Sequence, residues 1–115
     1  MSSVDAQYLV NSFNAIDEAT GKVIAADERG FISPPQGTVV VFQNPNPDKK
    51  DSYVEVTDIV VEAAENSVKL QINDNELYPM YVDANNMKGL TSVYVYKIVV
   101  IDGGPFRYEA LSSRA

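Results

Sequence analysis

The chain has 115 residues, 45% of them hydrophobic and 22% charged, a composition that fits one folded domain and argues against a disordered acidic tail. Sixteen acidic residues against nine Lys and Arg give a net charge of −7, so nucleic acid is not expected as a partner. Cysteine and histidine are absent, which removes disulfides, thiolate nucleophiles, imidazole bases and the usual zinc sites. We therefore expect no enzyme activity and no cofactor.

The N-terminal region carries the weakest pattern. Residues 1–11 are predicted to form an extended arm or a short helix, ahead of one β domain over residues 12–115. A secretory signal is not predicted, because the first five residues carry an acid and no base. Residues 12–16 and 22–26 are predicted to pair as strands around a turn whose Gly21 suits a bulged hairpin.

Two strands are predicted in the middle of the chain. The first covers residues 37–43, between loops at residues 33–36 and 44–51 that are rich in Pro, Asn and Ser. The second runs from Tyr53 to Val61, where β-branched and polar residues alternate as in a half-buried strand.

The next segment predicts a hairpin. Val68, Leu70 and Ile72 recur at every second position of residues 67–72, so these three side chains are expected to point inward. Residues 73–76 favour a turn, after which the apolar pattern resumes over residues 77–82.

The C-terminal segment predicts a second hairpin. Residues 92–101 are rich in aromatic and β-branched residues and are predicted as a central strand, although this stretch is too short to cross a membrane. Two glycines and a proline follow in residues 102–105, and residues 106–111 are predicted to fold back antiparallel.

These elements amount to seven or eight short strands separated by turn signals, with no long amphipathic helix. The predicted fold class is all-β, either an antiparallel β-sandwich or a jelly-roll-like barrel.

Seven tyrosines and four phenylalanines are the most informative functional signal, because tyrosine combines an apolar ring with a hydrogen-bonding hydroxyl and is enriched at interfaces. Tyr94 and Tyr96 fall on one face of a predicted strand, and Val93 and Val95 fall on the other. Either the two rings pack across neighbouring strands inside the sheet, or they contact a partner.

Two further rings and a thioether surround Pro79, which does not fit a central strand because it lacks a backbone N–H. This element is predicted at a sheet edge, where unpaired backbone groups favour binding of a partner. The predicted partner-binding residues are Tyr78, Met80, Tyr81, Tyr94 and Tyr96.

Oxygen-rich loops are candidates for a cation site. Asp74, Glu76, Asp83 and Asn85 are the predicted calcium ligands, but the spacing over residues 83–89 does not match a calcium-binding loop. Turn formation explains the same residues. A hydrolase that relies on carboxylates alone needs two of them in one cleft, and the sequence singles out no such pair.

Residues 77–111 contain Leu-Tyr-Pro-Met-Tyr-Val-Asp-Ala-Asn-Asn, then Val-Tyr-Val-Tyr-Lys-Ile-Val-Val-Ile, then Gly-Gly-Pro-Phe-Arg-Tyr-Glu. This succession resembles the C-terminal half of small β-rich structural proteins of bacteriophages, which are head-decoration or tail accessory proteins. The resemblance covers about a third of the chain and carries no catalytic residue. It implies a virion component that docks on a capsid or tail, as a homo-oligomer with residues 1–10 as an anchoring arm.

The leading hypothesis is therefore a non-enzymatic structural or interaction protein that binds other proteins or further copies of itself. Its expected location is the virion if the resemblance holds, and neither nucleic acid nor a membrane is an expected partner. The alternative is a carbohydrate-binding module that uses the tyrosine-rich face, with calcium from the acidic loops as an assisting ion.

Overall fold

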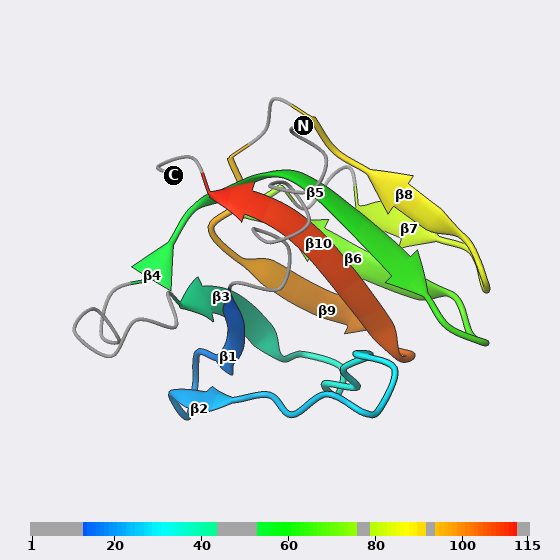
Figure 1. Ribbon diagram of the computed structural model, residues 1–115, viewed down its shortest axis with the longest axis horizontal. Helices are drawn as coiled ribbons and strands as arrows, with labels where there is room; N and C mark the ends of the chain where they lie inside the picture. Colours follow the sequence, from blue (N-terminus) through cyan, green and yellow to red (C-terminus); the bar gives the residue numbers. More distant parts are fainter. Residues whose placement is uncertain (1–12, 44–52, 76–78, 92–93, 113–115) are drawn as a thin grey trace.

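Ten β-strands make up the part of the chain that the computed structural model describes, which is residues 13–43, 53–75, 79–91 and 94–112 (Figure 1). Within these ranges there is no helix, and hence none that is long and apolar enough to cross a membrane. The predicted all-β class is confirmed. The arm predicted over residues 1–11 and the loop predicted over residues 44–51 lie outside the described residues.

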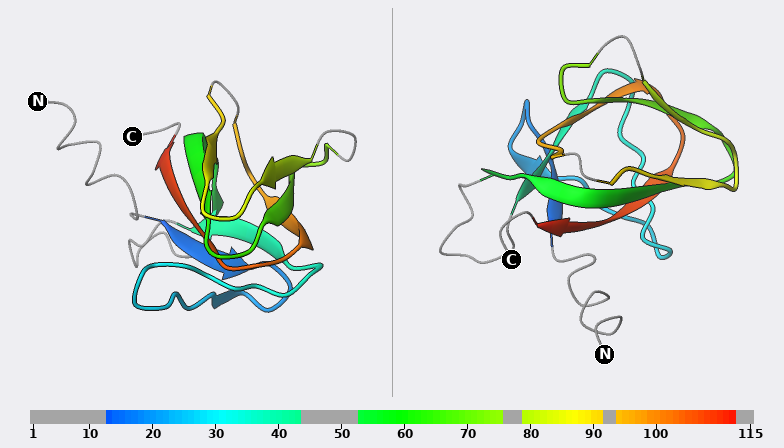
Figure 2. Two further views of the ribbon diagram at one scale, coloured as in Figure 1. Left: turned by 90° about the vertical axis from the view of Figure 1, so that its right-hand side faces the viewer. Right: turned by 90° about the horizontal axis from the view of Figure 1, so that it is seen from above.

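The strands form two antiparallel sheets that enclose one core, as in a β-sandwich (Figure 2). The larger sheet has the order β2 (Lys22–Val23), β1 (Asn14–Asp17), β3 (Val39–Gln43), β9 (Ile98–Asp102), β6 (Val68–Ile72) and β7 (Met80–Val82), with β4 (Tyr53–Val54) also paired to β3. The smaller sheet has the order β10 (Phe106–Ser112), β5 (Val56–Ala63) and β8 (Met87–Gly89). Among the described strands β7 is thus at an edge of its sheet, as predicted for the element around Pro79.

One segment contributes to both sheets. β4 pairs with β3 in the larger sheet, and after the single residue Glu55 the chain continues as β5 in the smaller sheet. The strand predicted from Tyr53 to Val61 is therefore present, but it passes from one sheet to the other and extends to Ala63.

The N-terminal hairpin follows the prediction, with a shorter second strand. The backbone N–H of Gly21 donates to the carbonyl oxygen of Asp17 at 2.7 Å, and Gly21 has a φ of 70°, which glycine adopts without strain. β2 covers only Lys22–Val23, because the chain then turns away and Ala26 bridges Ile32 instead.

The central strand predicted over residues 92–101 is shorter than expected. β9 begins at Ile98, and Val95 instead forms an isolated bridge with Val56 of β5. In the segment before β9, the side chain of Asn73 forms hydrogen bonds with backbone groups that a strand would use for pairing. The central position is confirmed, because β9 lies between β3 and β6.

The predicted C-terminal hairpin is wrong in its pairing. β10 pairs with β5 in the smaller sheet and not with β9, which precedes it. Phe106 is fully buried and exchanges two backbone hydrogen bonds with Ile32, of 2.8 and 3.0 Å. Gly104 lies in the connection between β9 and β10, where a Cβ would lie only 3.1 Å from the Cβ of Asn66, so this position favours glycine.

The core lies between the two sheets and consists of alternate side chains. In β6 the inward residues Val68 and Leu70 are fully buried, whereas Lys69 and Gln71 are half-buried on the other face, as predicted. The smaller sheet contributes Ile59 of β5 to this core. Among the described residues, no charged or polar side chain is buried. Each buried aliphatic side chain of this kind stabilises the fold by about 1.5–3 kcal/mol.

Candidate binding surface

Two exposed tyrosines flank a fully buried valine. Tyr94 is 61% and Tyr96 is 42% exposed, whereas Val95 is 0% exposed. Val95 exchanges backbone hydrogen bonds of 2.8 and 3.0 Å with Val56, which holds it in the core. The alternation predicted for this segment is present, and both rings are accessible to solvent.

Asn73 holds the backbone that carries both rings. Its side-chain N–H donates to the carbonyl oxygen of Tyr94 at 2.8 Å. Its side-chain oxygen accepts from the backbone N–H groups of Tyr96 at 2.8 Å and of Lys97 at 3.3 Å. Asn73 has a φ of 58°, a left-handed conformation that asparagine tolerates better than most residues. One side chain thus holds backbone groups of three residues of the segment, Tyr94, Tyr96 and Lys97.

Asp74 joins the side chains of Tyr96 and Lys97. Its Oδ2 accepts a hydrogen bond from the Tyr96 hydroxyl at 2.5 Å, and its Oδ1 lies 2.7 Å from Lys97 Nζ. Hydrogen bonds from the Lys97 ammonium and, to a smaller extent, from the Tyr96 hydroxyl hold the pKa of Asp74 below its ordinary value. The carboxylate in turn raises the pKa of both partners. We name Asn73, Asp74, Tyr94, Tyr96 and Lys97 the tyrosine cluster.

Tyr81, another of the predicted partner-binding residues, lies apart from this cluster. Tyr81 is 50% exposed, and its hydroxyl is 3.4 Å from Ser67 Oγ, near the start of β6, whereas the cluster follows the end of β6. Met80 is 5% exposed and lines a cavity. Tyr78 lies outside the described residues.

The predicted calcium ligands that the structure describes do not converge. Asp74 follows β6 and Asp83 follows β7, and the antiparallel register of these strands places the two residues at opposite ends of the hairpin. Asn85 has a φ of 60° and lies in the turn between β7 and β8. Glu76 lies outside the described residues, and the remainder of the described chain holds no group of three acidic side chains placed for a metal ion.

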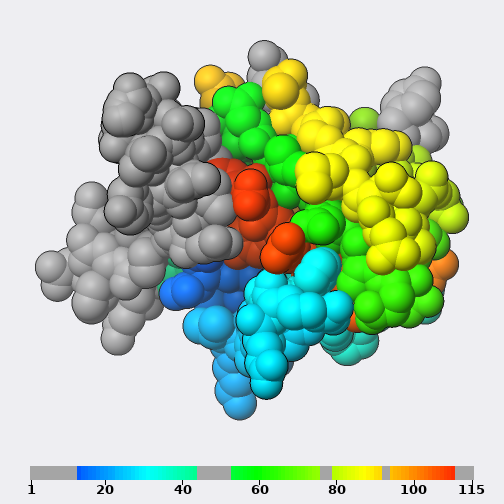
Figure 3. Space-filling view, turned by 45° about the vertical axis from the view of Figure 1, so that its right-hand side comes forward, coloured from blue at the N-terminus to red at the C-terminus, as the bar shows by residue number. Residues whose placement is uncertain are grey.

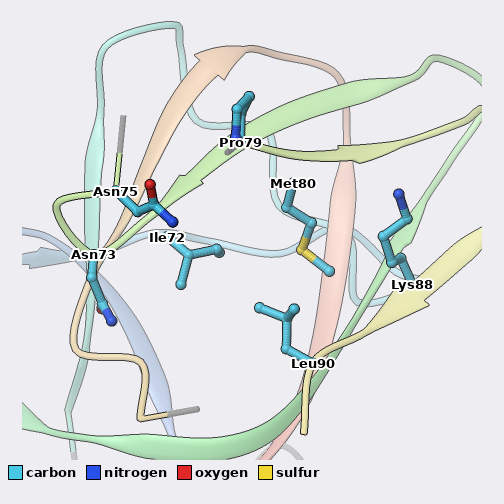
Figure 4. Close-up of a pocket in the computed structure, with 7 residues that line it drawn as sticks. All are labelled: Ile72, Asn73, Asn75, Pro79, Met80, Lys88 and Leu90. Atoms are coloured by element: carbon cyan, nitrogen blue, oxygen red, sulfur yellow. The ribbon is translucent and has the colours of Figure 1, made fainter. Parts of the chain in front are cut away.

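A cavity of about 390 Å³ lies between the edge strands β7 and β8. Its walls come from both sheets and from the turn between β6 and β7. They consist of Ile72, Asn73, Asn75, Pro79, Met80, Lys88 and Leu90 (Figure 4). Because Asn73 also belongs to the tyrosine cluster, the cavity adjoins the segment that presents the exposed rings.

A second aromatic network covers the smaller sheet. The ring of Phe31 lies 4.7 Å from the guanidinium carbon of Arg29 and 5.0 Å from that of Arg107, and Phe31 is only 7% exposed. Arg107 donates to Glu62 at 2.6 Å and to the carbonyl oxygen of Arg29 at 3.0 Å. Figure 3 shows this loop, in cyan, against β10, in red. We name Asp27, Arg29, Phe31, Glu62 and Arg107 the arginine clamp.

Asp27 closes the loop of the arginine clamp. Its carboxylate accepts the backbone N–H groups of Arg29 at 2.8 Å and of Phe31 at 3.0 Å. The hydrogen bond from Phe31 is the first cause that lowers the pKa of Asp27. Because the guanidinium groups of the clamp cover the ring of Phe31, we infer that the clamp stabilises the fold and does not bind a partner.

Comparisons with protein-family models, with curated proteins and with solved structures gave no match. The functional argument therefore rests on the tyrosine cluster and the adjoining cavity.

Sequence reasoning missed three parts of this region. It assigned Asn73 to a turn without its bonds to residues 94–97, and it did not single out Lys88 or Leu90. For Lys88 a local signal did exist. In a strand over residues 87–89, the side chain of Lys88 points to the face opposite to that of its neighbours Met87 and Gly89. The bonds of Asn73 had no such signal, because they connect residues more than 20 positions apart.

Proposed function

We propose that this protein is a non-enzymatic interaction protein that binds another protein surface through the tyrosine cluster. The observation that carries the proposal is the exposure of Tyr94 and Tyr96 on a backbone held by Asn73 and by the buried Val95. Rings presented on a rigid backbone lose little conformational entropy on binding, and tyrosine is enriched among residues that dominate binding energies. The exposed Asp74 supplies a polar rim.

The specific form of the proposal is an accessory component of a virion that docks on a capsid or tail surface. Its support is the resemblance of residues 77–111 to structural proteins of bacteriophages, a stretch that includes both exposed tyrosines of the cluster. Further copies of the chain are included among the partners, because most soluble oligomers are symmetric assemblies of one chain.

Light scattering on a size-exclusion column, over about a hundredfold range of concentration, tests whether a second copy is the partner. The expected result is a mass that is a multiple of the chain mass and that returns to the monomer when Tyr94→Ala and Tyr96→Ala are combined. Val23→Ala is the control, because Val23 is 57% exposed but lies on the edge strand β2, which β1 and β3 separate from β9. An oligomer that the double variant leaves unchanged would exclude the cluster as the contact between copies.

A chain that stays monomeric directs the test to a viral surface. Labelled protein is then titrated onto purified capsids and tails, and saturable binding is expected for the wild type and for Val23→Ala. The double tyrosine variant should bind more than about tenfold more weakly, since truncation of residues that dominate an interface costs about 2 kcal/mol or more each. Equal binding of all three proteins would contradict the proposed contact.

Carbohydrate binding is the second candidate function. One observation favours it, namely that the exposed face of Tyr96 stands beside the charged side chains of Asp74 and Lys97. Ring faces and hydrogen-bonding groups together suit a sugar ring and its hydroxyls. A glycan array, with and without calcium, separates the two candidates. Glycan binding that Tyr96→Ala abolishes would support carbohydrate binding, whereas the absence of any glycan binding would favour the protein contact.

A further inference from the structure

The cavity between β7 and β8 is apolar in the middle and polar at its ends. Figure 4 shows Met80 and Leu90 pointing toward each other across it, with Lys88 at one end and two asparagines at the other. Met80 and Ile72 are 5% and 8% exposed, so two of its walls belong to the core. Its volume of about 390 Å³ lies in the range of small-molecule sites.

Lys88 borders this cavity from an edge strand. It pairs with Val61 of β5, which is fully buried, and directly paired residues of neighbouring strands share one face of the sheet. Its neighbour Met87 is paired with Glu62 and points to the other face. Lys88 is nevertheless exposed, so its apolar stem borders the cavity while its ammonium stays hydrated.

The charge of the cavity is opposite in sign to that of the protein. Lys88 is the one charged residue among the described residues that line it, in a chain of net charge −7. The ion pairs found in the described part of the chain do not include Lys88, whereas Lys97 is paired with Asp74. A cation beside an apolar space is complementary to an anionic group that is attached to an apolar body.

We propose that this cavity binds a small amphipathic anion, whose aliphatic or aromatic body lies between Met80 and Leu90 and whose carboxylate or sulfonate pairs with Lys88. The body fills the apolar space that Met80, Ile72 and Leu90 line, and the anion makes a charge-assisted hydrogen bond with the ammonium. This site goes beyond the protein contact proposed above and does not depend on it.

Fluorescence titration with anilinonaphthalene sulfonate, followed by competition with decanoate or decanol, tests the site. We expect saturable binding of the dye and displacement by decanoate at lower concentration than by decanol. Lys88→Gln should weaken decanoate binding by about tenfold and leave decanol binding unchanged, because only the anion uses the ammonium. Lys22→Gln is the matched control, because it removes the same charge from β2. It should leave the binding of both decanoate and decanol unchanged.

Three results would overturn the proposal. The first is the absence of saturable binding of both dye and decanoate to the folded wild type. The second is an equal loss of decanoate binding in Lys88→Gln and Lys22→Gln, which would indicate general attraction by surface charge. The third is dye binding that appears only as the near-ultraviolet circular dichroism is lost, because this dye also binds partly unfolded chains.

Discussion

The tyrosine cluster and the arginine clamp both join an aromatic ring to charged side chains, yet they leave the ring in opposite states. In the clamp, the guanidinium carbons of Arg29 and Arg107 lie over the ring of Phe31, and Phe31 is 7% exposed. In the cluster, Asp74 binds only the hydroxyl of Tyr96, and the residue stays 42% exposed. Charged groups over a ring face cover it, whereas a charged group at its edge orients it and leaves the face free. The clamp therefore stabilises the fold, and the cluster presents a surface.

The largest expected difference between the two networks comes from removing the covered ring. Phe31→Ala should lower the free energy of unfolding by about 3 kcal/mol, because it removes a buried ring that contacts two guanidinium groups and leaves a void in its place. Urea denaturation measures this change, and Phe31→Leu is the control that keeps most of the apolar volume and should cost about 1 kcal/mol. A cost below about 1 kcal/mol for Phe31→Ala would show that the clamp does not stabilise the fold.

A smaller effect is expected where the cluster is anchored. Asn73→Ala should cost about 2 kcal/mol, since it removes the side-chain bonds to residues 94, 96 and 97 and places alanine at a φ of 58°. Asn73→Gly keeps the backbone conformation without those bonds, so it should cost less. Hydrogen exchange of the Tyr96 amide should accelerate in both variants. If neither variant changes that rate, the Val95 bridge alone holds the segment.

The two networks also differ in how they hold a carboxylate. The pKa of Asp27 is lowered first by the backbone N–H of Phe31, and that of Asp74 first by the Lys97 ammonium. Both groups bind protons more weakly in the folded than in the unfolded chain. Their contribution to stability is therefore present above the ordinary aspartate pKa and is lost as the pH falls through the folded value.

Salt should separate these two causes. At about 1 M salt the pKa of Asp74 should rise toward its ordinary value, because an exposed ion pair is screened, whereas the pKa of Asp27 should move less. Carboxyl-carbon NMR titration measures both residues in one sample. An equal response would mean that the same kind of interaction holds both carboxylates.

The smallest effect on stability is expected at the exposed ring. Tyr94→Ala should change the free energy of unfolding by less than about 0.5 kcal/mol, because Tyr94 is 61% exposed. The same urea denaturation applies, with Phe31→Ala as the reference for a covered ring. A loss of about 2 kcal/mol or more would place Tyr94 in the packing of the fold and remove it from the proposed contact surface.

Local patterns were sufficient for strands whose faces differ in polarity. Residues 67–72 alternate strictly, and the structure turns Val68 and Leu70 inward as predicted. The same reasoning identified the alternation of Tyr94, Val95 and Tyr96 without showing that Val95 bridges a strand of the other sheet. It also predicted a C-terminal hairpin, whereas β10 pairs with β5. The candidate site was predicted in part, since its two tyrosines were named while Asn73 and Lys88 were not assigned to it.

The sequence by itself determined the all-β class and which side chains of a strand point inward, because alternation with a period of two is a local property of the chain. The tertiary structure alone decided which strands pair, because backbone hydrogen-bonding groups are the same at nearly every residue and identify no partner. That pairing brought Asn73 to residues 94–97 and placed the consecutive strands β7 and β8 in different sheets, and so created the tyrosine cluster and the cavity. Both features depend on which strands pair, and the local pattern of side chains does not specify that pairing.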